Sequence, residues 1–223
     1  MSWYKKDIEE AAKVEGGGNY LSESGIYDIE IIAAFVDTND SGARTINLYV
    51  DYNGQDQTLY GAIRLDNNDG TRNFQAGLLD KLMTVANLDD LSAPEEGTLP
   101  IGKEGADRDV AVLTDLCDVS AKIHLQMEYK IYQGKMQERK VIKAFFTPEG
   151  ASAEEILNET EAGKRLATII EKGYDKNITY KDGATEENVA QWIASGRKDG
   201  VTAASGSESS SSAPRSKPKF GRK

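Results

Sequence analysis

Three stretches of alternating apolar and polar residues follow one another near the start of the chain, and they constrain the fold more than any other feature. The first covers 26–37, where apolar Tyr27, Ile29 and Ile31 are separated by acidic residues. The second and third cover 43–52 and 57–65, and turn-forming residues separate all three. Alternation at period two is typical of β-strands with one buried face. The sequence therefore predicts a three-stranded antiparallel meander.

A helix and further strands follow this meander. Apolar residues at helical spacing predict a helix over 73–88. Prolines and glycines predict a long loop over 89–107, and a strand is expected over 109–116. Alternation over 121–132 and 138–147 then predicts a long hairpin. Three strands, a helix and a hairpin are the element order of the OB-fold. We therefore expect a mainly β fold with some α: a five-stranded OB-like antiparallel barrel with a helix between strands 3 and 4.

Three segments remain outside the predicted barrel, which occupies residues 25–150. Helical spacing predicts helices over 153–174 and 185–196, with Thr185 in a position to cap the second of them. The three segments are an N-terminal arm with a glycine hinge over 1–24, a C-terminal helical segment over 151–198, and a disordered Ser-rich basic tail over 199–223.

Charge is distributed unevenly along the chain. The formal net charge is −10. Residues 201–223 nevertheless hold five bases and one acid, a net +4, which leaves −14 on the first 200 residues. Within that acidic body, residues 122–143 hold six bases and two acids, again +4. Such a local concentration of bases can bind phosphates even on an acidic protein, because phosphate contacts depend on the local potential.

Strand alternation places several of these bases, with tyrosines, on the predicted outer face of the barrel. Tyrosine rings can stack on nucleic-acid bases while lysines and arginines contact phosphates. Two structural explanations stay open: tyrosine favours exposed sheet faces, and lysines protect edge strands from aggregation. The candidate nucleic-acid-binding residues are Tyr49, Tyr60, Arg64, Lys122, Lys130, Tyr132, Lys135, Arg139, Lys140 and Lys143.

Several other chemistries lack the residues they need. The only cysteine is Cys117 and the only histidine is His124, which excludes a cysteine-built zinc site and most histidine-based catalysis. The loop 66–70 lacks the glutamate of a calcium-binding loop. No phosphate-binding glycine motif and no concentrated acid–base cluster is present. We therefore expect no enzyme activity, no cofactor and no metal. The absence of long apolar runs and of a signal sequence predicts a cytoplasmic protein without a membrane partner.

The chain resembles phage-encoded single-stranded DNA-binding proteins over roughly residues 25–155. The similarity lies in the strand pattern GIYDIEIIAAFVDTNDSGARTINLYVDYNGQDQTLYGAIRL, the helix NFQAGLLDKLMTVANL and the later VIKAFFTPEGASAEE. The resemblance implies an OB-fold that coats single strands without sequence preference in phage DNA replication, recombination and repair. It also implies the host cytoplasm and no cofactor. Self-association on DNA and binding of replication or recombination proteins are further hypotheses for such a protein.

The end of the chain departs from that family, in which many members carry a flexible acidic tail. Here the tail is basic, and it raises two hypotheses: it adds phosphate contacts, or it docks on the acidic body of a neighbouring subunit. The alternative function is that of a non-enzymatic β-barrel adaptor or structural protein, whose acidic body and basic tail bind protein partners. The candidate tail contacts are Arg215, Lys217, Lys219, Phe220, Arg222 and Lys223.

Overall fold

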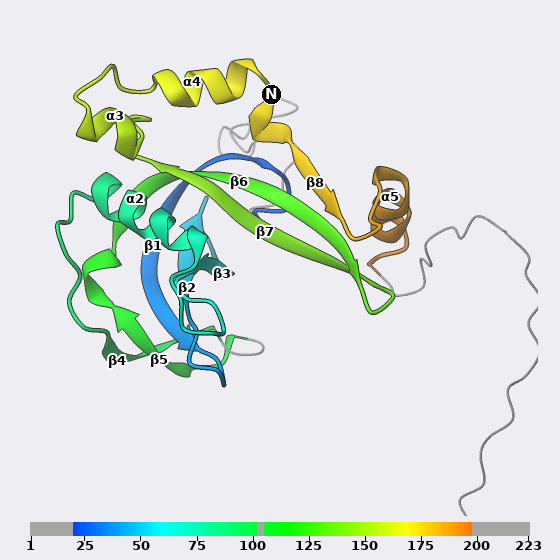
Figure 1. Cartoon of the computed structure of the whole chain (residues 1–223), viewed down its shortest axis with the longest axis horizontal. Helices are drawn as coiled ribbons and strands as arrows, with labels where there is room; N and C mark the ends of the chain where they lie inside the picture. Colours follow the sequence, from blue (N-terminus) through cyan, green and yellow to red (C-terminus); the bar gives the residue numbers. More distant parts are fainter. Residues whose placement is uncertain (1–19, 102–104, 198–223) are drawn as a thin grey trace, which may run out of the picture.

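A computed structural model describes residues 20–101 and 105–197, which form a mainly β structure with few helices. Its centre is an open, mostly antiparallel sheet of eight strands (Figure 1). The predicted arm helix, the glycine hinge at 16–18 and the tail 199–223 lie outside the described residues. The strands are β1 Gly25–Thr38, β2 Arg44–Tyr52, β3 Gln55–Arg64, β4 Glu95–Leu99, β5 Arg108–Leu113, β6 Val119–Tyr132, β7 Lys135–Phe146 and β8 Ile178–Lys181. The helices are η1 Phe74–Ala76, α2 Gly77–Val85, η3 Thr114–Leu116, α3 Ala153–Leu157, α4 Lys164–Glu171, η4 Tyr174–Lys176 and α5 Glu186–Ala194.

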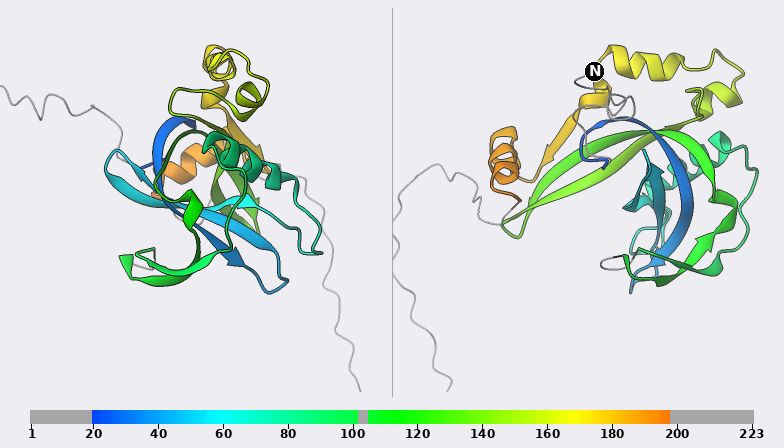
Figure 2. Two further views of the ribbon diagram at one scale, coloured as in Figure 1. Left: turned by 90° about the vertical axis from the view of Figure 1, so that its left-hand side faces the viewer. Right: turned by 180° about the vertical axis from the view of Figure 1, so that it is seen from behind.

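β1 is the strand that joins the parts of the sheet. It pairs with β2 along most of its length, with β6 through its first half, and with β5 through its second half. β2 also pairs with β3, so the predicted meander is confirmed. β6 and β7 form the predicted long hairpin. Figures 1 and 2 show this hairpin reaching away from β1–β3, with α5 beside its tip, while the β4–β5 hairpin lies near the end of β1.

The main core lies between the curved sheet and helix α2. Leu82 and Val85 are the buried side chains of α2, and they pack into this core. Each fully buried aliphatic side chain contributes on the order of 1.5–3 kcal/mol through the hydrophobic effect. The predicted inward-facing sets of the strands are confirmed in part by their burial. Ala33 and Phe35, which alternation placed with Ile29 and Ile31, lie in a different cluster on the opposite side of the sheet, because the β1–β2 register shifts between Ile31 and Ala33. The members of the predicted sets that lie in the main core include Ile29, Ile31, Ile46, Leu48, Val50, Leu59, Ile63, Ile123 and Leu125.

The structure corrects three of the expected elements. β4 lies inside the predicted loop 89–107; its sequence Glu-Glu-Gly-Thr-Leu has no apolar alternation, and backbone pairing with β5 defines it. β8 was not expected, and it pairs in parallel with β6. The predicted helix over 153–174 is broken, because Gly163 adopts a left-handed φ of 83° before α4 begins.

None of the helices in the described residues is long and apolar enough to cross a membrane.

A second core lies on the other side of the β1–β2 pair, under the β4–β5 hairpin. Phe35 of β1 and Tyr49 of β2 pack there against Val110 and Val112 of β5. The expected outward, solvent-facing position of Tyr49 is therefore wrong, and its side chain is buried. The physical reason is that an element about sixty residues later in the chain covers this face of the sheet. The Tyr49 hydroxyl donates a hydrogen bond of 2.7 Å to Asp56 Oδ2.

The burial of Tyr49 makes the stability of the protein sensitive to alkaline pH. Desolvation, then the hydrogen bond and charge of Asp56, raise the pKa of Tyr49 to about 12. A tyrosine of the unfolded chain ionises near pH 10. This contribution to stability is fully present below pH 10 and is lost as the pH rises toward 12. We expect the free energy of unfolding to fall by on the order of 2 kcal/mol over this window, and less in Tyr49→Phe. Urea unfolding at several pH values measures the free energy of unfolding of both proteins. If this free energy fell equally with pH in the wild type and in Tyr49→Phe, the prediction would be contradicted.

Candidate nucleic-acid interface

The distal half of the β6–β7 hairpin has two faces of different chemistry. Strand alternation puts Met127 and Tyr129 on one face and Glu128 and Lys130 on the other. Residues that pair across the two strands share a face. Arg139 and Lys135 of β7 therefore lie on the face of Glu128, and Met136 and Lys140 lie on the face of Met127. The face that carries Tyr129 is covered by α5 and the opposite face is not.

On the covered face, side chains of the hairpin pack against α5 and the residues before it in a third apolar cluster. Its buried members are Met127, Tyr129, Met136, Ala184, Val189 and Trp192. Tyr129 stacks on Tyr180 of β8 with ring centroids 6.2 Å apart, and Trp192 of α5 meets Tyr129 edge-on at 6.3 Å. α5 begins with the predicted cap: Thr185 accepts a hydrogen bond from the Asn188 backbone N–H, and the Asn188 side chain accepts one from the Thr185 N–H. The packing of β8 and α5 therefore stabilises the hairpin, which would be only marginally stable as an isolated pair of strands.

The opposite face, here called the basic face, consists of Lys130, Tyr132, Lys135, Arg139 and Lys181. Lys130 and Lys181 are paired positions of the parallel strands β6 and β8. Lys181 also forms an ion pair of 2.6 Å with Glu128, which is buried on this face. The Lys130 ammonium lies 5.6 Å from the centre of the Tyr132 ring, in cation–π contact. The basic face therefore joins positive charge to an aromatic ring that is 54 % exposed.

Lys181 is not among the residues predicted from the sequence, because the sequence does not predict β8. The signal that could have found it is the alternation of Ile178 and Tyr180 with Thr179 and Lys181, a four-residue stretch too short to distinguish from a loop.

Strand β3 contacts the basic face at Gly61, the residue after Tyr60, where the β2–β3 ladder is irregular. The register shifts between Ile46 and Leu48, opposite Gly61. Gly61 has a φ of 65°, and the buried Asn47 side chain accepts a hydrogen bond of 2.7 Å from its N–H. Arg139 of the basic face donates a hydrogen bond of 3.5 Å to the Gly61 carbonyl oxygen. The Tyr60 ring remains 53 % exposed, and its hydroxyl donates to the Ile101 carbonyl oxygen at 3.0 Å.

Two exposed tyrosines therefore stand at the two ends of a row of bases. Arg139, which contacts the carbonyl oxygen of Gly61 next to Tyr60 in the chain, is four residues along β7 from Lys135, which pairs with Tyr132. Four residues of a β-strand span about 13 Å. Among the residues that the structure describes, this row brings together Lys130, Tyr132, Lys135 and Arg139 of the residues predicted from the sequence.

The other predicted residues lie elsewhere. Lys122 is near the opposite end of β6 and forms an ion pair with Asp28. Lys140 pairs with Met127, so it shares the face covered by α5, and burial lowers its pKa. Arg64 donates hydrogen bonds to the Asp66 carbonyl oxygen and to the Asn68 side chain. The predicted tail contacts lie outside the described residues.

Lys143 lies at a register shift of the β6–β7 pair, away from the basic face. Burial lowers the pKa of the neighbouring His124, and the positive charges of Lys143 and Arg165 lower it further. Across 20–101 and 105–197, no three histidine, cysteine or acidic side chains gather in a way that could hold a metal ion.

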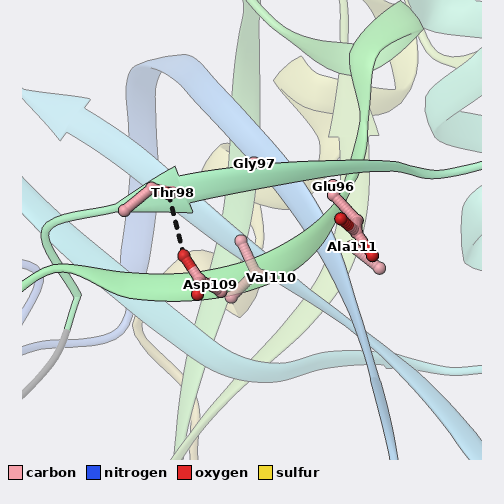
Figure 3. Close-up of a pocket in the computed structure, with 6 residues that line it drawn as sticks. All are labelled: Glu96, Gly97, Thr98, Asp109, Val110 and Ala111. Atoms are coloured by element: carbon pink, nitrogen blue, oxygen red, sulfur yellow. Dashed lines mark hydrogen bonds between the residues drawn. The ribbon is translucent and has the colours of Figure 1, made fainter.

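A hollow on the β4–β5 hairpin has the opposite character. Figure 3 shows the residues that line it: Glu96, Gly97, Thr98, Asp109, Val110 and Ala111. The Thr98 hydroxyl donates a hydrogen bond of 2.9 Å to Asp109 Oδ1. Two acids and no base or aromatic ring line this hollow, so it does not suit phosphate groups.

Two comparisons with known proteins were negative. No model of a protein family matches the chain, and a search of curated proteins gives no match.

Proposed function

We propose that this protein binds single-stranded DNA through the basic face and Tyr60. The observation that carries the proposal is the row of Lys130, Lys135 and Arg139 on a chain of net charge −10. Half-exposed Tyr132 stands at one end of this row, and the other end contacts Gly61, the neighbour in the chain of half-exposed Tyr60. Lysine and arginine neutralise the phosphates of a single strand, and tyrosine rings stack on its bases. A flexible single strand can present both groups to one narrow face, whereas a duplex keeps its bases stacked inside.

The proposed binding is sequence-nonspecific. A ring face stacks on any base, so recognition by Tyr60 and Tyr132 does not depend on base identity. Phosphate contacts carry no direct sequence information. Together with the resemblance of the sequence to phage single-stranded DNA-binding proteins, this supports a non-enzymatic coating role in phage DNA replication, recombination and repair in the host cytoplasm. Replication or recombination proteins are then its proposed protein partners.

We also propose that β1, β2, β3, β6 and β7 are the five strands of an OB-like barrel. β1 pairs with both β2 and β6, and α2 lies between β3 and β6 in the chain, where an OB-fold has its helix. The hydrogen bond from Arg139 to Gly61 brings β7 toward β3. The β4–β5 hairpin is then an insertion, and it covers part of the outer face that a plain barrel would leave free.

Titration of the full chain with a fluorescent oligo-dT of about 30 nucleotides tests the proposal, with a duplex of equal length as the control. We expect tighter binding to the single strand, and we expect the affinity to fall as salt rises because bound phosphates release counterions. Equal affinity for the duplex would contradict single-strand binding. An absence of binding at low salt would remove the proposal and favour the protein-adaptor function.

A further inference from the structure

The β4–β5 hairpin is strongly acidic, and its acids are not part of the proposed DNA site, which contacts the hairpin only where Tyr60 bonds to Ile101 in its loop. Residues 89–118 contain nine acids and two bases, a net charge of −7. Four of the acids are exposed on or beside the hairpin, and they are here called the acidic lobe: Glu95, Glu96, Asp107 and Asp109. The neighbouring base Arg108 forms an ion pair with Asp37 of β1 at 3.0 Å, so it already has an acidic partner.

The acidic lobe includes an open sheet edge. β4 pairs with β5 and with no other strand in the described part of the chain, and it ends the path β3-β2-β1-β5-β4. Alternate backbone N–H and C=O groups along the other edge of β4 therefore have no strand partner there. Such an edge accepts an added extended segment through main-chain hydrogen bonds.

The two faces of this hairpin are also distinct. Cross-strand pairing places Glu96, Thr98 and Asp109 on the solvent face. Val110 and Val112 point into the second core, where Leu99 of β4 packs against them. A segment added at the edge of β4 would therefore meet Glu96 and Asp109 on one face, and on the other face the apolar groups together with Glu95 and Arg108 at the ends of the strands.

The C-terminal segment 213–223 has the matching chemistry. It carries five bases and no acid, and it ends 26 residues beyond Arg197, the last described residue. From Arg197 to Arg215 a fully extended chain spans about 60 Å. This length allows the segment to reach the acidic lobe of its own chain or of a neighbouring copy.

We propose that residues 213–223 bind along the open edge of β4. In a strand, Arg215, Lys217 and Lys219 fall on one face at period two, which suits Glu96 and Asp109. Phe220 falls on the other face, toward the apolar side of the hairpin. Pro218 lacks an N–H, but at an edge position its nitrogen can face solvent. The charges of residues 213–223 and the alternation of their side chains thus both favour binding along the edge of β4.

Cross-linking of the full chain without nucleic acid locates the segment. A carbodiimide couples lysine amines to carboxylates that they contact. We expect Lys217, Lys219 or Lys223 to couple to the acidic lobe at about 0.02 M salt, and the yield to fall several-fold at about 0.5 M salt as screening shortens the reach of the charges. Coupling spread over acids elsewhere on the surface would overturn the proposal.

A pair of variants tests whether the acidic lobe is required. Backbone amide NMR signals of 213–223 in the full chain are compared with those of a free peptide of the same sequence. We expect Glu95→Gln/Glu96→Gln/Asp107→Asn/Asp109→Asn to shift these signals to the free-peptide positions, with the signals of the folded core unchanged. The matched control neutralises four exposed acids near α3 and α4, and it should retain the wild-type signals: Glu149→Gln/Glu159→Gln/Glu161→Gln/Glu171→Gln.

These experiments are made without nucleic acid. A negative result would therefore contradict docking of the tail and would leave the proposed DNA binding untouched. Wild-type tail signals that already match the free peptide would overturn the docking proposal. If the same signals moved only when oligo-dT was added, the tail would be a phosphate contact and the acidic lobe would not be its site.

Discussion

Replacing Lys130, Lys135 and Arg139 together with alanine should weaken oligo-dT binding about 100-fold at 0.1 M salt. Each base that neutralises a phosphate adds about 0.7 to the slope of log affinity against log salt for a single strand. Three lost contacts should therefore reduce the magnitude of that slope by about 2. Fluorescence anisotropy at four or more salt concentrations gives both the affinity and the slope.

Lys181 is left in place in this variant for a structural reason. Its partner Glu128 is 8 % exposed, and removing Lys181 would leave a buried carboxylate without its ion-pair partner. Loss of binding could then reflect a distorted hairpin. The matched control, Lys81→Ala/Lys164→Ala/Lys176→Ala, removes three exposed bases elsewhere and should keep nearly the wild-type affinity and slope. Equal losses in the two variants would show that binding depends on total charge and not on the basic face.

Tyr60→Ala combined with Tyr132→Ala should produce the second large loss of affinity. A base stacked on an aromatic ring contributes on the order of 1–3 kcal/mol, so each substitution should weaken binding about 5- to 150-fold. The slope against salt should stay close to that of the wild type, because neither tyrosine neutralises a phosphate. The two predictions therefore differ in a measurable way: the lysine and arginine variant changes the slope, and the tyrosine variant does not.

Two controls separate stacking from other effects of the tyrosines. Tyr60→Phe keeps the ring and loses only the hydrogen bond to the Ile101 carbonyl oxygen, so it should retain binding. Tyr20 and Tyr174 are 58 % and 49 % exposed outside the basic face, and their replacement by alanine should leave the affinity unchanged. If Tyr60→Phe lost as much affinity as Tyr60→Ala, the contact with the Ile101 loop would be the cause and stacking would not.

The buried sides of the long strands could be predicted because alternation is a local property. In β1, β2 and β6, residues two apart lie on one face, and Ile31, Leu48 and Ile123 are buried as expected. The same rule identified Lys130 and Tyr132 as neighbours on one outward face. The cap of α5 was also predictable, because Thr185 and Asn188 interact within a single turn.

The faces opposite the main core could not be predicted in this way. Whether Tyr49 meets solvent depends on β4 and β5, which come about sixty residues later and cover it. Whether Lys140 faces solvent depends on α5, whose packing covers its side of the hairpin. Alternation states which residues share a face, and it does not state what lies against that face.

The sequence by itself determined the order of the long strands, the inward sets of the main core and the excess of bases in residues 122–143. These follow from local spacing and from charge counts. Only the tertiary structure decided which of the bases lie together on one face. Parallel pairing of β8 added Lys181, a hydrogen bond from Arg139 to Gly61 joined β3 to the same surface, and the β4–β5 hairpin buried Tyr49. The physical reason is that these contacts join residues far apart in the chain, through backbone pairing and packing that leave no periodic trace in the sequence.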